Sequence, residues 1–88
     1  MKRNPDFMLR DVAGKSVLVP VGKAAAAFPG MITVNPAGKF IWELLEKPHT
    51  LDEVVRAMME RYEVSEETAR ADAKTFLSRL MSVKAVME

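Results

Sequence analysis

The residue pattern changes at Asn35, and this change constrains the fold more than any other feature of the chain. Before Asn35, short apolar runs rich in β-branched residues are separated by glycine and proline, which is typical of strands. After Asn35, apolar residues recur every three or four positions behind helix-capping residues, which is typical of amphipathic helices. Strands followed by helices predict an α+β fold, with the helices segregated to one side of a small antiparallel sheet.

The first two predicted strands form a hairpin. They run over residues 7–12 and 16–21, and the glycine in the turn Ala13-Gly14-Lys15 favours a short connection. Apolar and other residues alternate along the second strand with a period of two, which predicts one clear face. The residues of that face are Val17, Val19 and Val21.

A third strand is predicted directly before Asn35. It is short and rich in β-branched residues, and it consists of Met31, Ile32, Thr33 and Val34. The alanine-rich stretch 23–28 in front of it is expected to be a loop or a single helical turn, because Pro29-Gly30 ends the run early.

Three helices are predicted after Asn35, each with its own start signal. Asn35 caps the first, and Pro36 stands at the first helical position, where its missing N–H leaves no hydrogen bond unmade. Thr50 caps the second, with Glu53 completing a capping box, and Ser65 caps the third. The residues expected on their buried faces are Ala37, Phe40, Ile41, Leu44, Leu45, Leu51, Val54, Val55, Met58, Tyr62, Ala69, Ala73, Phe76, Leu77 and Leu80. The tail 83–88 is either a short extended return or a frayed end.

Length and composition limit the classes of function. The 88 residues have room for one domain, spanning residues 1–88. A formal net charge of +1 argues against a nucleic-acid partner, because phosphate binding usually requires a strong positive surplus. The chain has no cysteine, no apolar stretch of signal-peptide length behind its first residues, and no run near the ~20 apolar residues of a membrane span. We expect a cytoplasmic protein with no membrane partner.

The chain lacks the residue sets that catalysis and cofactor binding usually need. His49 is the one histidine, and neither a second histidine nor a cysteine can join it in a metal or nucleophile site. Gly14, Gly22, Gly30 and Gly38 do not match a phosphate-binding loop, and turn chemistry at element boundaries explains them. The sequence therefore predicts neither enzymatic activity nor a cofactor or metal.

Two features admit more than one interpretation. Arg70, Lys74 and Arg79 form a basic row on the third helix, which is either a solvated face or a site for an acidic peptide. Trp42 packs at the sheet–helix junction or contributes to a docking surface.

Four segments occur in the order and spacing of a known family, from about residue 4 to residue 83. They are Asn4-Pro5-Asp6-Phe7-Met8-Leu9-Arg10, then Val17-Leu18-Val19-Pro20-Val21-Gly22, then Gly30-Met31-Ile32-Thr33-Val34-Asn35 with Ile41-Trp42-Glu43-Leu44-Leu45, and finally residues 62–72 leading to Phe76-Leu77-Ser78-Arg79-Leu80. Together they resemble the PqqD family, whose fold is also called the RiPP recognition element. One departure is the tail, where Val83-Lys84-Ala85-Val86 lacks the glycine usual in the family.

The resemblance implies a winged-helix-like domain, a three-stranded antiparallel sheet followed by three helices, that binds the leader segment of a ribosomally made precursor peptide. Such a chaperone presents the peptide to a modifying enzyme, often a radical enzyme with iron–sulfur clusters. The peptide would add as a strand beside the third strand and rest against the third helix. Carried onto this chain, the peptide-binding residues are Met31, Ile32, Thr33, Val34, Arg70, Ala73, Lys74 and Leu77.

One alternative function is a winged helix–turn–helix DNA-binding protein, because short helices beside a hairpin are its ingredients. Its recognition helix would need several basic and amide side chains on one face. The second predicted helix offers Arg56 and Arg61 alone, and the third has no Asn or Gln, so the peptide adaptor is favoured. The sequence leaves open the precursor peptide, the modifying enzyme and the oligomeric state.

Overall fold

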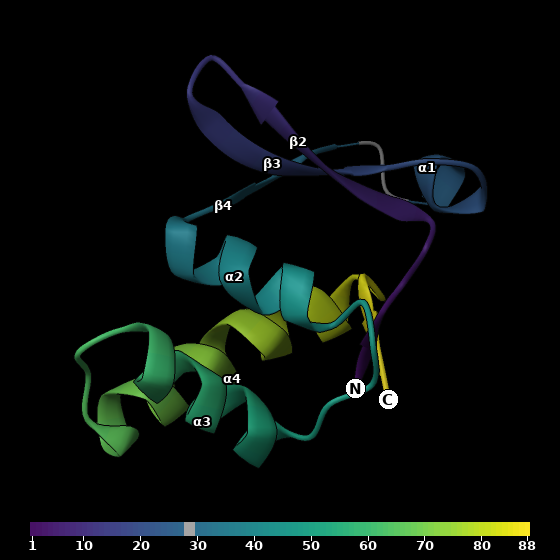
Figure 1. The fold of residues 1–88 in the computed structure, drawn as a ribbon. Helices are drawn as coiled ribbons and strands as arrows, with labels where there is room; N and C mark the ends of the chain where they lie inside the picture. Colours follow the sequence, from purple (N-terminus) through teal and green to yellow (C-terminus); the bar gives the residue numbers. More distant parts are fainter. Residues whose placement is uncertain (28–29) are drawn as a thin grey trace.

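The computed structural model describes residues 1–27 and 30–88 and shows a three-stranded sheet on one side of a group of helices (Figure 1). The sheet is antiparallel, in the order β2-β3-β4. Its strands are β2 (Phe7–Val12), β3 (Lys15–Pro20) and β4 (Ile32–Val34), and the helices that follow are α2 (Pro36–Leu44), α3 (Leu51–Arg61) and α4 (Glu66–Ser82). The predicted α+β, winged-helix-like order of three strands and then three helices is confirmed.

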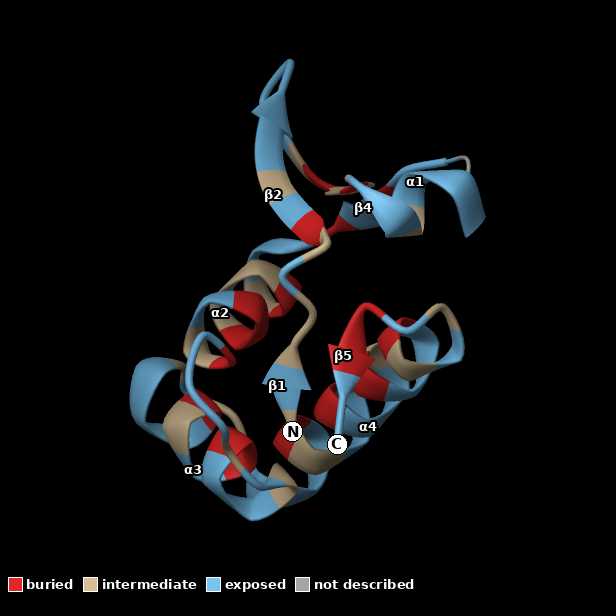
Figure 2. Ribbon diagram, turned by 90° about the vertical axis from the view of Figure 1, so that its right-hand side faces the viewer, coloured by how far each residue is buried: buried red, intermediate tan, exposed pale blue. Residues whose placement is uncertain are grey.

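Three shorter elements complete the fold. The tail is an extended return, since β5 (Val86–Met87) pairs antiparallel with β1 (Lys2–Arg3) (Figure 2). The alanine-rich stretch contains a five-residue helix, α1 (Lys23–Ala27), which is little more than one turn. The predicted end of this stretch at Pro29 lies outside the described residues. Strand β1 was not predicted, because two residues carry no periodicity.

The β2–β3 hairpin turns through two residues. Val12 pairs with Lys15, so Ala13 and Gly14 form the loop, with φ angles of 53° and 80°. Positive φ at both positions is characteristic of a type I′ turn, whose twist matches that of the flanking strands. The predicted turn is therefore in the right place but one residue shorter, because Lys15 belongs to β3. Alanine in a left-handed conformation costs about 1–2 kcal/mol.

Replacing Ala13 should stabilise the protein. Asparagine tolerates the left-handed region better than alanine, so Ala13→Asn should raise the free energy of unfolding by about 0.5–1 kcal/mol. Urea unfolding followed by the fluorescence of the single tryptophan measures this. The control Ala25→Asn places the same side chain at an exposed helical position and should give no gain. No gain in Ala13→Asn would contradict the strain assigned to this turn.

Leu18 is the β3 residue that packs in the main core cluster, and Val17 is buried as well, with 8% exposed. Leu18 is completely buried and pairs across the sheet with Ile32, which is 4% exposed. Successive side chains of a strand alternate between faces, so Val17 and Val19 point to the opposite side. Val17 and Val19 thus share one face, as predicted, but β3 is apolar on both faces, so its alternation of residue types does not identify the side that faces the helices.

The helices begin where their caps predict. The Asn35 side chain accepts a hydrogen bond from the Gly38 N–H at 2.7 Å. Thr50 and Glu53 exchange the two hydrogen bonds of a capping box, and Ser65 accepts from the N–H of Thr68 at 3.1 Å. Among the described residues, no helix combines the length and the hydrophobicity that crossing a membrane requires.

One cluster of buried apolar residues joins the sheet to the helices. Trp42 belongs to it, with 2% of its surface exposed and the Arg3 guanidinium 5.7 Å from its ring, which excludes the docking-surface interpretation of this residue. Most of the predicted helical core residues are buried. The exceptions, which are only partly buried, are Ala37, Phe40, Leu44, Leu51, Tyr62 and Phe76.

Truncating a buried residue of α4 should destabilise the protein strongly. Leu77 is 3% exposed, so Leu77→Ala should lower the free energy of unfolding by about 2–5 kcal/mol through lost burial and a cavity. Met59 on α3 is 41% exposed, so the control Met59→Ala should change stability by less than about 0.5 kcal/mol. Equal losses in the two variants, measured by urea unfolding, would contradict the packing described here.

Candidate functional site

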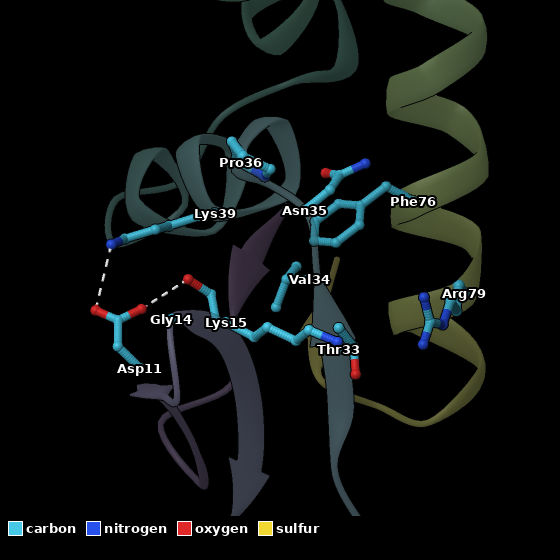
Figure 3. Close-up of a pocket in the computed structure, with 11 residues that line it drawn as sticks. Asp11, Gly14, Lys15, Thr33, Val34, Asn35, Pro36, Lys39, Phe76 and Arg79 are labelled. Atoms are coloured by element: carbon cyan, nitrogen blue, oxygen red, sulfur yellow. Dashed lines mark hydrogen bonds and ion pairs between the residues drawn. The ribbon is translucent and has the colours of Figure 1, made fainter.

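An open groove of about 710 Å³ runs between the edge strand β4 and helix α4 (Figure 3). Its residues come from the β2–β3 hairpin, β4, the start of α2 and the second half of α4. They are Asp11, Gly14, Lys15, Ser16, Thr33, Val34, Asn35, Pro36, Lys39, Phe76 and Arg79.

The floor of the groove is the free edge of the sheet. On one side, β4 pairs with β3 through Val34 and Ser16, Thr33 and Val17, and Ile32 and Leu18. On its other side, no strand within the described part of the chain pairs with it. Alternate residues of an edge strand direct N–H and C=O groups outward. The groove therefore offers unpaired backbone donors and acceptors.

The wall of the groove depends on a close approach at Gly38. A Cβ atom on Gly38 would lie 2.7 Å from Cε1 of Phe76 and 2.7 Å from Cγ1 of Val34, closer than packed carbon atoms tolerate. Glycine thus lets α2 pack directly against side chains of both β4 and α4. The explanation of Gly38 by turn chemistry at an element boundary is wrong, since this residue lies inside α2.

Some charged residues around the groove are paired with an opposite charge and others are not. The carboxylate of Asp11 accepts a hydrogen bond from Oγ of Ser16 at 2.7 Å and lies 3.5 Å from Nζ of Lys39. First the Ser16 hydrogen bond and then the Lys39 charge lower the pKa of Asp11, which therefore stays ionised at neutral pH. Among the described residues, Lys15 and Arg79 have no carboxylate within 4.0 Å. The groove is positively charged.

Of the strand residues predicted for the site, Thr33 and Val34 line the groove, whereas Met31 and Ile32 do not. Ile32 and Val34 belong to the core, with 4% and 5% of each residue exposed, so their side chains are not available to a ligand. Thr33 is exposed and lines the groove. Met31 precedes β4 and is 66% exposed, which makes it the residue of this stretch with the most accessible side chain.

The helix residues predicted for the site lie on other faces of α4. Ala73 and Leu77 are 0% and 3% exposed and belong to the core. Arg70 turns toward α3, where its guanidinium lies 2.8 Å from Asp52, and this hydrogen bond raises the pKa of Arg70. Lys74 is exposed without lining the groove. None of these four helix residues lines the groove, and peptide binding by them is untested and stays a prediction.

The residues of α4 that line the groove are Phe76 and Arg79, and Figure 3 shows both side chains coming from this helix, on one side of β4. Phe76 was assigned to the core and Arg79 to the outer basic row. A neighbouring hollow extends the same stripe of α4 through Asp72 and Thr75. The sequence could have indicated this stripe, because Asp72, Thr75, Phe76 and Arg79 are spaced to lie on one face of a helix. The sequence does not indicate that this face lies opposite β4, because that depends on how the elements pack.

Comparison with known proteins identifies the family. The family description of coenzyme PQQ synthesis protein D (PqqD) matches residues 15–86. The chain belongs to the PqqD family. No curated protein matches its sequence.

Solved structures share the fold. TbiB1 in complex with the TbiA(beta) leader peptide has a TM-score of 0.74 at 24% identity, over 97% of this chain and 93% of that chain. Lasso peptide synthetase B1 complexed with the leader peptide also has a TM-score of 0.74, at 17% identity, over 99% of this chain and 96% of that chain. The match over nearly the full length of each chain shows that this PqqD-family chain has the same arrangement of elements.

Adding a methyl group at Gly38 should disturb the groove wall of this PqqD-family chain. The overpacking at Phe76 and Val34 should cost about 1–3 kcal/mol, against a gain of up to about 1 kcal/mol in helix propensity. We expect Gly38→Ala to lower the free energy of unfolding by about 1 kcal/mol net and to shift the ring protons of Phe76 in NMR spectra. A variant more stable than the wild type would show that propensity outweighs the contact.

Proposed function

We propose that this PqqD-family chain is a non-catalytic adaptor that binds the leader segment of a ribosomally made precursor peptide in the groove between β4 and α4 and presents it to a modifying enzyme. The observation that carries this proposal is the unpaired edge of β4 facing an aromatic and basic helix wall. The family match supports it, as do the two structural neighbours, which are complexes with leader peptides.

The chemistry of the groove suits an extended peptide. The outward-facing backbone groups of alternate residues in β4 would pair with the N–H and C=O groups of an added strand, whatever its sequence. Side chains of that strand alternate, so every second one would face α4 and meet Phe76 or Arg79. Backbone pairing supplies affinity and the helix wall supplies selectivity.

Binding the leader segment leaves the rest of the precursor free to reach an enzyme. When the adaptor also contacts that enzyme, the modifiable segment is held at a high effective concentration near the active site. The chemical step then belongs to the enzyme, and the adaptor needs only to bind and release. This division of labour requires a groove that recognises a peptide and no catalytic group of its own.

The DNA-binding alternative is not favoured. Its recognition helix would be expected to direct several free basic side chains to one face. Helix α3 has Arg56 and Arg61, and Arg61 lies over the ring of Tyr62 at 5.9 Å from its centroid. The two solved neighbours are also complexes with leader peptides, which supports peptide binding over DNA binding.

An NMR titration tests the proposed function. With a synthetic leader segment of the precursor peptide encoded beside its gene, we expect the amides of Ile32–Val34, Phe76 and Arg79 to shift together, because one strand would touch both walls. A peptide of the same composition in scrambled order serves as the control and should cause smaller shifts. Shifts that cluster on α3 instead, or none with any peptide encoded nearby, would rule out this groove.

A further inference from the structure

We infer that the groove selects peptides in which an acidic side chain stands two positions from an apolar anchor. The inference rests on the proposed function, because it assumes a peptide strand paired with β4. It goes further by naming the class of peptide, and it follows from the way in which Phe76 and Arg79 are placed along the edge of the sheet.

The spacing follows from strand geometry. Ile32 and Val34 direct their side chains to the helical side of the sheet, so peptide residues opposite them face the same side, toward α4. Residues of one face recur about 6.8 Å apart along a strand. Phe76 and Arg79 are three residues apart on α4, which corresponds to a rise of about 4.5 Å along the helix axis. The arginine side chain is long enough to cover the difference between this rise and the strand spacing. One peptide side chain meets Phe76, and the side chain two positions away meets Arg79.

The anchor site is apolar. Phe76 is half-buried, and its ring packs above Val34 at the place where Gly38 removes the intervening Cβ atom. Asn35 and Pro36 border the same end of the groove (Figure 3). A leucine or an aromatic residue of the peptide would cover the exposed edge of this ring and remove apolar area from water.

The preference of the groove for an acidic peptide side chain follows from which basic residues already have a carboxylate partner. Arg70 is occupied by Asp52 at 2.8 Å and Glu66 at 3.5 Å, and Lys39 by Asp11 at 3.5 Å. Arg79 has no carboxylate within 4.0 Å in the described part of the chain, although Asp72 lines the neighbouring hollow with it. A peptide carboxylate is the group that a free guanidinium binds best, through two parallel hydrogen bonds.

Lys15 strengthens the same preference from the other side of β4. It lines the groove beside Thr33 and has no carboxylate within 4.0 Å among the described residues. The groove therefore carries three basic residues and one acidic residue, Asp11, which is already paired. A lysine-rich peptide would meet uncompensated repulsion here, and an acidic one would not.

Fluorescently labelled ten-residue peptides of threonine and valine test the inference. Each peptide carries one central leucine and one variable residue. In the test peptides, Glu, Gln or Lys stands two positions before or two positions after the leucine. In the spacing control, Glu stands next to the leucine. In fluorescence anisotropy titrations, one of the peptides with Glu two positions away should bind about fivefold more tightly than its Gln counterpart, as expected for a partly exposed ion pair. Arg79→Glu should reverse the order, so that the Lys peptide binds best.

The control variant Arg56→Glu makes the same change in net charge on α3, outside the groove, and should leave the Glu preference intact. Equal affinity for the Glu and Gln peptides would overturn the inference. A loss of the Glu preference in Arg56→Glu as large as that in Arg79→Glu would also overturn it, because it would indicate general charge attraction. Equal affinity for the peptides with Glu at the adjacent position and with Glu two positions away would overturn the proposed spacing. In each of these cases the peptides would still shift the amides of Ile32–Val34. If none of them shifts those amides, the proposed function fails and the inference with it.

Discussion

The contact at Gly38 is the constraint on which the rest of the groove depends. Helix α2 begins directly after β4, so its first turn must pass close to the edge strand. Without a side chain at Gly38, the helix backbone approaches Val34 and Phe76 to a distance that any other residue would prevent. This approach gives the sheet edge and α4 a common wall, and it holds the aromatic ring beside unpaired backbone groups.

Helix α4 divides its faces between stability and recognition. One face supplies four buried residues to the core, Ala69, Ala73, Leu77 and Leu80. The adjacent stripe, with Phe76 and Arg79, remains available at the groove. Phe76 on this stripe packs against the core with only part of its side chain, and Arg79 is exposed. A small domain can thus keep part of its longest helix open to a ligand.

An open sheet edge is a liability, and this chain limits it by keeping the edge short. Strand β4 has three residues, which is too few for extended pairing between copies. The positive charge of Arg79 and Lys15 beside it disfavours association with an identical edge, because like charges would meet. The same charges attract an acidic guest. One arrangement of residues therefore protects the edge and selects its ligand.

Local chemistry made much of the fold predictable. The caps at Asn35, Thr50 and Ser65 act through hydrogen bonds within three residues, so the helix starts were confirmed. The hairpin was placed correctly because its turn is also local. The alternation along β3 did not identify the side that faces the helices, because both faces of the strand are apolar. The pairing of β1 with β5 was missed because it joins the two ends of the chain.

The sequence by itself determined the order of elements, their start signals and the resemblance to the PqqD family, since these depend on neighbouring residues and on spacing along the chain. Only the tertiary structure decided which stripe of α4 faces β4 and which arginine remains unpaired there. The sequence shows Glu66 four residues before Arg70, but it does not show that Asp52 on α3 is the closer partner of Arg70 or that Arg79 has no carboxylate within 4.0 Å among the described residues. The physical reason is that such partners are set by packing between elements distant in sequence, which no local pattern encodes.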